Sequence, residues 1–104
     1  MPRIKDTIGT HKTVVYMENG SQCVRYHATL IARLDPNGVV TLNTGGWHTV
    51  TTKRRMNECL RFWGAENSHW QVFQKKGIWY VSQYLGNGLH SEPVEFFDNM
   101  ELVA

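Results

Sequence analysis

The spacing of apolar residues predicts one amphipathic helix near the middle of the chain. Four apolar side chains recur at i, i+3, i+4 and i+7, which places them on one helical face: Met56, Cys59, Leu60 and Trp63. Gly64 follows this pattern directly and is a typical residue at a helix end. We therefore expect a helix over about residues 52–63 whose apolar face packs against a core.

Alternating apolar and polar positions, or β-branched and aromatic runs, predict strands on either side of this helix. The expected strands cover residues 13–17, 22–34, 39–43, 70–74 and 78–83, with two further short ones at 94–97 and 100–103. In the long second strand we expect a buried face made of Val24, Tyr26, Ala28, Leu30 and Ala32. The turn sequences 19–20, 35–38 and 75–77 should join antiparallel neighbours, and residues 84–93 are expected to form a loop.

These elements predict an α+β fold: a single small domain in which one main helix packs on one face of an antiparallel sheet of five to seven strands. A length of 104 residues suits one such domain. Residues 1–12 are polar and lack a period, so we expect an N-terminal arm there and the domain over residues 13–104. No apolar run approaches the ~20 residues of a membrane span, and residues 1–10 lack a signal-peptide core, so we expect a cytoplasmic protein without membrane contact.

Cysteine and histidine usage predicts neither a disulfide framework nor a metal site. Cys23 and Cys59 are too few for such a framework, so buried reduced thiols are expected. Cys23 and His27 share a face of the predicted strand, but they lie too far apart along it to bind one zinc ion. No dinucleotide fingerprint is present, and we expect no cofactor.

Charge is distributed unevenly along the chain. Residues 41–83 contain six Lys and Arg against Glu58 and Glu66, whereas residues 84–104 contain no Lys or Arg. The acids of this last segment are Glu92, Glu95, Asp98 and Glu101. Clustered positive charge attracts anions. The acidic segment is either simply solvated, or it covers the basic region in the monomer, or it meets that region across a homodimer.

The strongest functional signal is the stretch TLNTGGWHTVTTKRRMN at residues 41–57. A helix N-terminus carries about half a positive charge, so Lys53, Arg54 and Arg55 in a first turn should each cost about 0.3–1 kcal/mol. A bound anion would offset that cost, and helix N-termini are common phosphate sites. The sequence therefore predicts that this turn receives a phosphate of a nucleotide or a nucleic acid.

The neighbouring residues supply the other groups that a phosphate site needs. Gly45 and Gly46 can present backbone amides without side chains in the way. Thr49, Thr51 and Thr52 add hydroxyls, and we expect one of the last two to be the N-cap. The segment is not a Walker A loop, because it lacks that motif's glycine spacing and GK[ST] ending. The alternative is structural: the glycines only make the turn, and the cations are solvated and partly offset by Glu58.

Aromatic residues form a second constellation. Trp47 and His48 share the loop before the basic turn, so the pair can sandwich a base while the turn holds its phosphate. The alternative is that Trp47 anchors the loop to the core. Four other aromatic residues are assigned to core packing, namely Trp63, Trp70, Trp79 and Tyr80.

Enzymatic activity is not expected. Five His residues are scattered along the chain without the local signature of a catalytic triad or dyad. A metal-free ribonuclease using His27, His48 and Lys53 for acid–base chemistry is kept as a third hypothesis. Paired carboxylates for metal-dependent phosphoryl transfer are missing from the basic region.

The run VTLNTGGWHTVTTKRRMN, followed by WQVFQKKGIWYV and the ending DNMELV, resembles small proteins of unassigned function encoded in tailed-phage genomes. The resemblance extends over residues 26–103 by the order of these motifs. It implies a small single-domain protein made inside an infected bacterium, and it assigns no catalytic or binding residues.

Two functions from different classes therefore compete, with the ribonuclease as the third. The first is binding of nucleic acid or a nucleotide, including sequestration of a phosphorylated defence signal, at a site formed by Gly45, Gly46, Trp47, His48, Thr51, Thr52, Lys53, Arg54 and Arg55. The second is a protein-interaction module that blocks a host enzyme or defence complex through the acidic C-terminal face. Exposed aromatic sheet edges also make a homodimer an expected arrangement.

Overall fold

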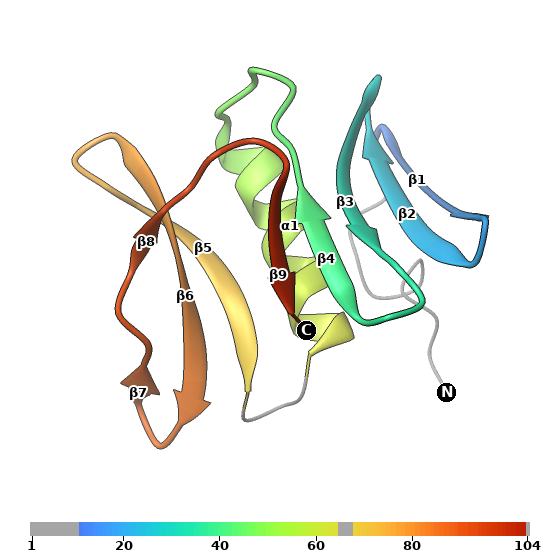
Figure 1. Cartoon of the computed structure of the whole chain (residues 1–104). Helices are drawn as coiled ribbons and strands as arrows, with labels where there is room; N and C mark the ends of the chain where they lie inside the picture. The colour runs from blue at the N-terminus through green and yellow to red at the C-terminus, as the bar shows by residue number, and fades with distance from the viewer. Residues whose placement is uncertain (1–10, 65–67, 104) are drawn as a thin grey trace.

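The structure is a computed structural model that describes residues 11–64 and 68–103. Within these residues the chain forms nine strands and one helix (Figure 1). In chain order they are β1 (Thr13–Glu18), β2 (Ser21–Tyr26), β3 (Thr29–Leu34), β4 (Val39–Leu42), α1 (Val50–Trp63), β5 (His69–Lys75), β6 (Ile78–Gly86), β7 (Leu89–His90), β8 (Val94–Glu95) and β9 (Met100–Val103). The α+β class and the single main helix are thus confirmed for the described part of the chain.

The strands form two antiparallel sheets rather than the one sheet that the sequence predicts. The first sheet has the order β1-β2-β3-β4-β9, so the last strand of the chain closes it beside β4. The second has the order β5-β6-β7, with β8 also paired to β6. Figure 1 shows α1 between these sheets, behind β4 and β9 in that view.

Short turns with local reasons join neighbouring strands. Asn19 and Gly20 both have positive φ, 52° and 83°, as the Asn-Gly turn between β1 and β2 requires. Between β3 and β4, Oδ1 of Asp35 accepts from the amides of Asn37 and Val39, both at 2.9 Å. These turns confirm the hairpins expected at residues 19–20 and 35–38.

The expected long strand over residues 22–34 is instead two strands, because the chain reverses at His27 and Ala28. His27 has a φ of 54°, and Tyr26 pairs with Thr29 across this two-residue turn. The reversal changes which side chains face inward. Val24 and Ala32 are buried as predicted, but Ala28 and Leu30 are exposed, and Ile31 is buried instead.

Two further boundaries differ from the sequence prediction. The helix begins at Val50 rather than at residue 52, and its N-cap is Thr49 rather than Thr51 or Thr52. Residues 84–93, expected as a loop, contain the end of β6 and all of β7, joined by a turn in which Asn87 and Gly88 have positive φ. Of the expected N-terminal arm, residues 1–12, the first ten residues lie outside the described part of the chain.

One continuous core joins both sheets to the apolar face of α1. Its fully or almost fully buried side chains include Val24, Ile31, Val40, Leu42, Met56, Cys59, Leu60, Val72, Trp79, Val81 and Leu102. Trp63 and Trp70 are partly buried and pack against this cluster, in agreement with their expected role. Cys23 and Cys59 are free, buried thiols, and burial raises the pKa of Cys59 from 9.0 to about 12, so this thiol is neutral at pH 7.

The side chain of Asn57 binds the helix to the backbone of the second sheet. The amide group of Asn57 donates from Nδ2 to the carbonyl of Val72 at 2.8 Å, and its Oδ1 accepts from the amide of Val72 at 2.7 Å. Asn57 thereby satisfies the backbone of β5 at its free edge, as a neighbouring strand would.

With 14 residues, α1, the helix of the described segments, is too short to span a membrane.

We expect Asn57→Ala to lower the free energy of unfolding by about 2 kcal/mol or more, because it leaves both backbone groups of the buried Val72 without partners. Urea denaturation followed by circular dichroism measures this change. Asn57→Asp keeps the acceptor but loses the donor, so it should fall between the wild type and Asn57→Ala. Wild-type stability of Asn57→Ala would show that the pair does not hold helix and sheet together.

Candidate functional site

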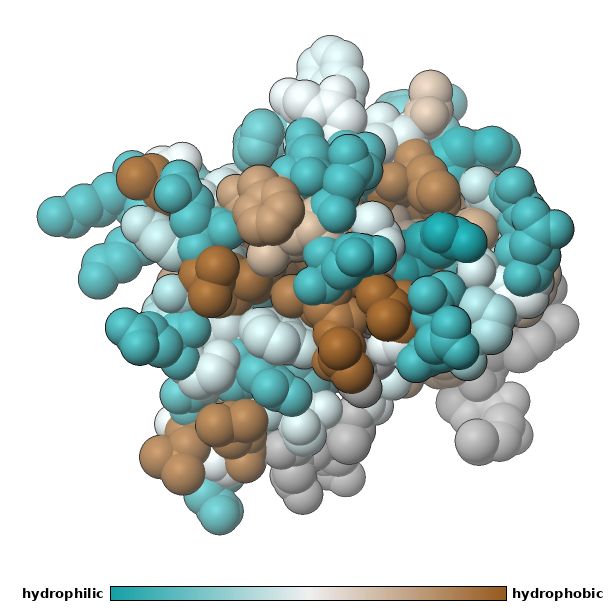
Figure 2. Space-filling model, viewed as in Figure 1, coloured by the Kyte–Doolittle hydropathy of each residue, from teal (hydrophilic) through white to brown (hydrophobic). Residues whose placement is uncertain are grey.

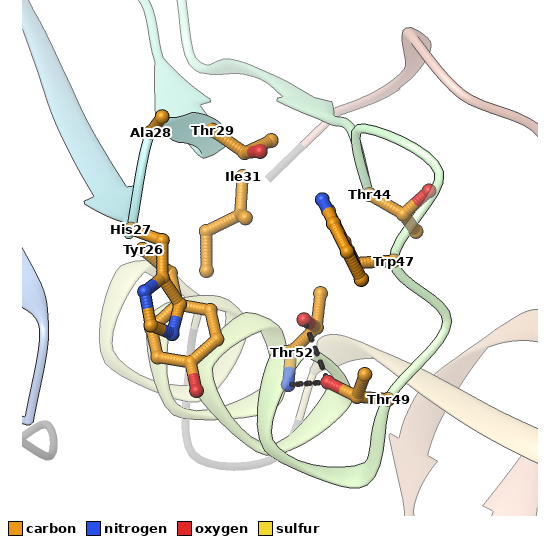
Figure 3. A pocket seen from close by; sticks show the side chains of 9 residues that line it. All are labelled: Tyr26, His27, Ala28, Thr29, Ile31, Thr44, Trp47, Thr49 and Thr52. Carbon is orange, nitrogen blue, oxygen red and sulfur yellow. Dashed lines mark hydrogen bonds between the residues drawn. The ribbon is translucent and has the colours of Figure 1, made fainter.

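A cavity of about 430 Å³ opens beside the start of α1 (Figure 3). Three segments line it: the β2–β3 turn with the start of β3, the loop between β4 and α1, and the first turn of α1. Its lining residues are Tyr26, His27, Ala28, Thr29, Ile31, Thr44, Trp47, Thr49 and Thr52. We call this hollow the Trp47 cavity.

Aromatic rings form two opposing sides of the Trp47 cavity. Trp47 projects from its loop with 67% of its surface exposed, and Figure 3 shows it across the hollow from Tyr26 and His27. The rings of Tyr26 and His27 are in edge-to-face contact, with centroids 4.4 Å apart. Ile31 is buried and closes the cavity toward the core. The cavity is thus a slot between aromatic side chains.

The helix start supplies polar groups at the same cavity. Oγ1 of Thr49, the N-cap, accepts from the amide of Thr52 at 3.1 Å and lies 3.0 Å from the Thr52 hydroxyl. The amides of Val50 and Thr51 belong to the first turn, where no carbonyl precedes them in the helix. No side chain in the described part of the chain accepts from these two amides. They remain available to an anion.

The Gly-Gly turn does not present free amides. Gly45 donates to Oδ1 of Asn43 at 2.8 Å, and Gly46 donates to Oγ1 of Thr44 at 3.1 Å. An anion at these amides would have to replace both bonds, so the helix amides are the better candidates. The glycines serve the shape of the turn instead: Gly45 has a φ of 62°, and a Cβ there would lie 2.5 Å from Oγ1 of Thr29.

The loop that carries Trp47 is held by the C-terminal part of the chain. Oδ1 of Asp98 accepts from the amide of Thr44 at 2.8 Å and from its hydroxyl at 2.9 Å. Beside it, the amide of Asn99 donates to the carbonyl of Leu42 at 2.7 Å. We call the contact between Asp98 and Thr44 the Asp98 latch. One of the four acids of the C-terminal segment is thus engaged in positioning the cavity loop.

The three consecutive cations point to different surroundings. Arg55 is buried, with Nη1 2.8 Å from Oε1 of Glu58 and Nε 3.3 Å from Oγ1 of Thr13. Lys53 lies 3.3 Å from Oε1 of Gln74. Arg54 is exposed. Successive residues of a helix are rotated by about 100°, and here this turns Arg55 inward to Glu58 and away from the surface that Lys53 and Arg54 share. Lys53 and Arg54 are therefore the candidates for an anion.

A second hollow, of about 340 Å³, follows the exposed face of α1. It is lined by Val50, Lys53, Arg54, Asn57, Glu58 and Arg61. Three of these six side chains are cationic and one is acidic, and the carboxylate of that acid is already bonded to Arg55. We call this hollow the basic groove. The sequence prediction included its first two cations but did not identify Arg61 as part of the same surface.

His48 does not share the Trp47 cavity. The ring of His48 contacts Trp79 edge to face, with centroids 5.0 Å apart. Trp47, in contrast, lines the Trp47 cavity. Tyr26 and His27 therefore take the place that the sequence interpretation gave to His48. The structure also separates His48 from His27, which lines the cavity, so the ribonuclease hypothesis gains no gathered set of groups. Within the described residues, no cluster of His, Cys, Asp or Glu could hold a metal ion.

The remaining C-terminal acids do not cover the basic groove. Glu92, Glu95 and Glu101 are exposed. In residues 11–64 and 68–103, no ion pair joins them to a cation of α1. Within this part of the chain the two oppositely charged regions are thus not paired with each other.

A family model described as Kyanoviridae Gp96 protein matches residues 3–103. The chain belongs to this family. The family is a phage protein family, which confirms the resemblance to phage-encoded proteins. No curated protein and no solved structure matches the chain.

We expect Asp98→Ala to lower the free energy of unfolding by about 2 kcal/mol, because hydrogen bonds to a charged group contribute about 1.5–3 kcal/mol. It should also broaden the NMR signals of residues 43–47, since the Asp98 latch fixes that loop. Glu95→Ala removes an exposed acid of the same segment and serves as the matched control. If both variants behave alike, the latch does not hold the loop.

Proposed function

We propose that this protein binds a phosphate-bearing ligand with a flat base, a nucleotide or a nucleic acid, in the infected bacterial cell. The base enters the Trp47 cavity and its phosphate lies at the start of α1. The observation that carries the proposal is that an aromatic slot and a helix N-terminus border one hollow. Each of these features alone is common, whereas their contact matches the two chemical parts of a nucleotide.

The base-binding part rests on the exposed ring of Trp47. A tryptophan with 67% of its surface in water gains contacts when a base stacks on it, and such stacking contributes about 1–3 kcal/mol per base. Tyr26 and His27 supply the opposite wall. Hydroxyls of Thr29 and Thr49 at the lining can contact the polar edges of a base or sugar.

The phosphate-binding part rests on the first turn of α1. The amides of Val50 and Thr51 point out of the positive end of the helix dipole. No acid lies in this turn, and Lys53 and Arg54 add positive charge beside it. A phosphate here would offset the unfavourable placement of these cations. Sequestration of a phosphorylated defence signal is one use that such a site supports.

A second candidate function is an interaction with a basic surface of a host protein. Three exposed apolar side chains accompany the C-terminal acids, with exposed fractions of 52% for Val94, 60% for Phe97 and 70% for Val103. Figure 2 shows apolar side chains set among hydrophilic ones on the face that carries β8 and β9. Apolar anchors with a charged surround are typical of protein interfaces.

Co-purification from infected cells tests this second candidate. A host protein that stays bound after nuclease treatment, and that is lost when Glu92, Glu95 and Glu101 are all changed to Lys, would support it. The matched control changes Lys75 and Lys76 to Glu. These two lysines are exposed and lie on another turn. Retention by the acid-to-Lys variant would exclude this face as the interface.

For nucleotide binding, we expect Trp47→Ala to weaken the binding of mononucleotides by about tenfold or more, as the loss of one stacked base predicts. Isothermal titration with AMP, GMP, CMP and UMP measures this affinity, with inorganic phosphate as the ligand without a base. Phe97→Ala removes an exposed aromatic ring from another surface and is the control. Equal affinities of the wild type and Trp47→Ala, or no binding of any nucleotide, would refute the proposed function.

A further inference from the structure

We propose that the basic groove continues the path of the ligand from the Trp47 cavity, so that the protein binds a single strand of nucleic acid of several nucleotides. This inference rests on the proposed function and deepens it by naming the ligand class. A free mononucleotide fills the cavity alone, whereas a strand fills the cavity and the groove. The two hollows must therefore be joined in a way that a sugar-phosphate chain can follow.

The first turn of α1 joins the two hollows. Thr49 and Thr52 line the Trp47 cavity, while Val50 and Lys53, each the next residue in the chain, line the basic groove. A phosphate at the amides of Val50 and Thr51 would lie on the ridge between them. When one base of a strand lies in the cavity, the phosphate next to it therefore lies at the start of the groove.

The length of the groove corresponds to several nucleotides. Arg54 and Arg61 are seven residues apart on α1, which is about 10 Å along the helix axis. That distance equals roughly three base steps of a stacked strand at ~3.4 Å each. When a mononucleotide phosphate lies at the helix start, no group of that ligand reaches Arg61. A strand with two or three further phosphates places a phosphate close enough to contact Arg61.

The groups in the groove suit a phosphate chain rather than base recognition. Lys53, Arg54 and Arg61 are cationic, and the carboxylate of Glu58 is bonded to Arg55. The amide of Asn57 is also committed, because both of its polar atoms bind Val72. The groove therefore offers positive charge with few free hydrogen-bonding groups of fixed direction. Such a surface follows a backbone without reading its sequence.

The cavity makes a single strand the expected form. A base that enters the slot between Trp47 and Tyr26 must have its faces and edges free. In a duplex the base is paired and stacked, and freeing it costs a few kcal/mol. Unpaired strands carry no such cost. The protein should therefore prefer single strands to duplexes of the same length.

Titration calorimetry with thymidylates of one, two, four and eight nucleotides tests this inference at low salt. The wild type should bind the four-nucleotide strand about tenfold more tightly than the mononucleotide, with little further gain at eight. Arg61→Ala should lose most of that gain and leave mononucleotide affinity unchanged. Added salt should weaken binding of the longer strands more steeply, because more counterions are released.

Arg33→Ala is the matched control, since Arg33 is an exposed cation on β3 outside both hollows. Equal affinity for one and eight nucleotides, or an unchanged length dependence in Arg61→Ala, would overturn the inference but leave the proposed function standing. The inference would also be overturned if the wild type bound an eight-base-pair duplex as tightly as the single strand of eight nucleotides. Failure of every thymidylate and every mononucleotide to bind would remove the proposed function and the inference together.

Discussion

The two hydrogen bonds between Asn57 and the backbone of Val72 are the constraint on which the arrangement of this fold depends. Within the described residues, no strand of the first sheet pairs with a strand of the second. The helix joins the two through its apolar face and through this amide. Because Asn57 takes the position of a strand partner along β5, it also fixes the rotation of α1. That rotation decides which side chains of the first turn face the cavity and which face the groove.

The same rotation explains why the basic cluster of the sequence is divided in space. Lys53, Arg54 and Arg55 are adjacent in the chain, but a helix distributes adjacent residues around its axis. Arg55 falls on the inward side, where a buried guanidinium needs a partner, and Glu58 one turn later provides it. The positive surface is then completed by Arg61. The helical period alone places Arg55 one turn from the buried Cys59, so this division is predictable from the sequence.

How far the sequence predicts the structure depends on whether the signal is local. The apolar period of α1 and the Asn-Gly turn at residues 19–20 are local, and both were predicted correctly. The reversal at His27 has no such local signal, because neither His nor Ala is a typical turn residue. The hydrogen bonds of the Gly45 and Gly46 amides are also local, because Asn and Thr side chains often accept from amides two residues later. They are therefore predictable from the sequence in principle. The cavity, by contrast, is formed by segments that meet only in the folded chain, and no sequence spacing shows that Tyr26 faces Trp47.

The Asp98 latch has a consequence for the stage of folding at which the Trp47 cavity forms. Asp98 is 54 residues beyond Thr44, so the loop of Trp47 is fixed by a part of the chain that is synthesised much later. Asp98 lies two residues before β9, so we expect the latch to form together with the pairing of β9 and β4. Contacts so distant in sequence are among the last to form during folding. A nascent chain that has already folded its first hairpins should therefore still lack the proposed ligand site, which we expect to form only as the final strand completes the sheet.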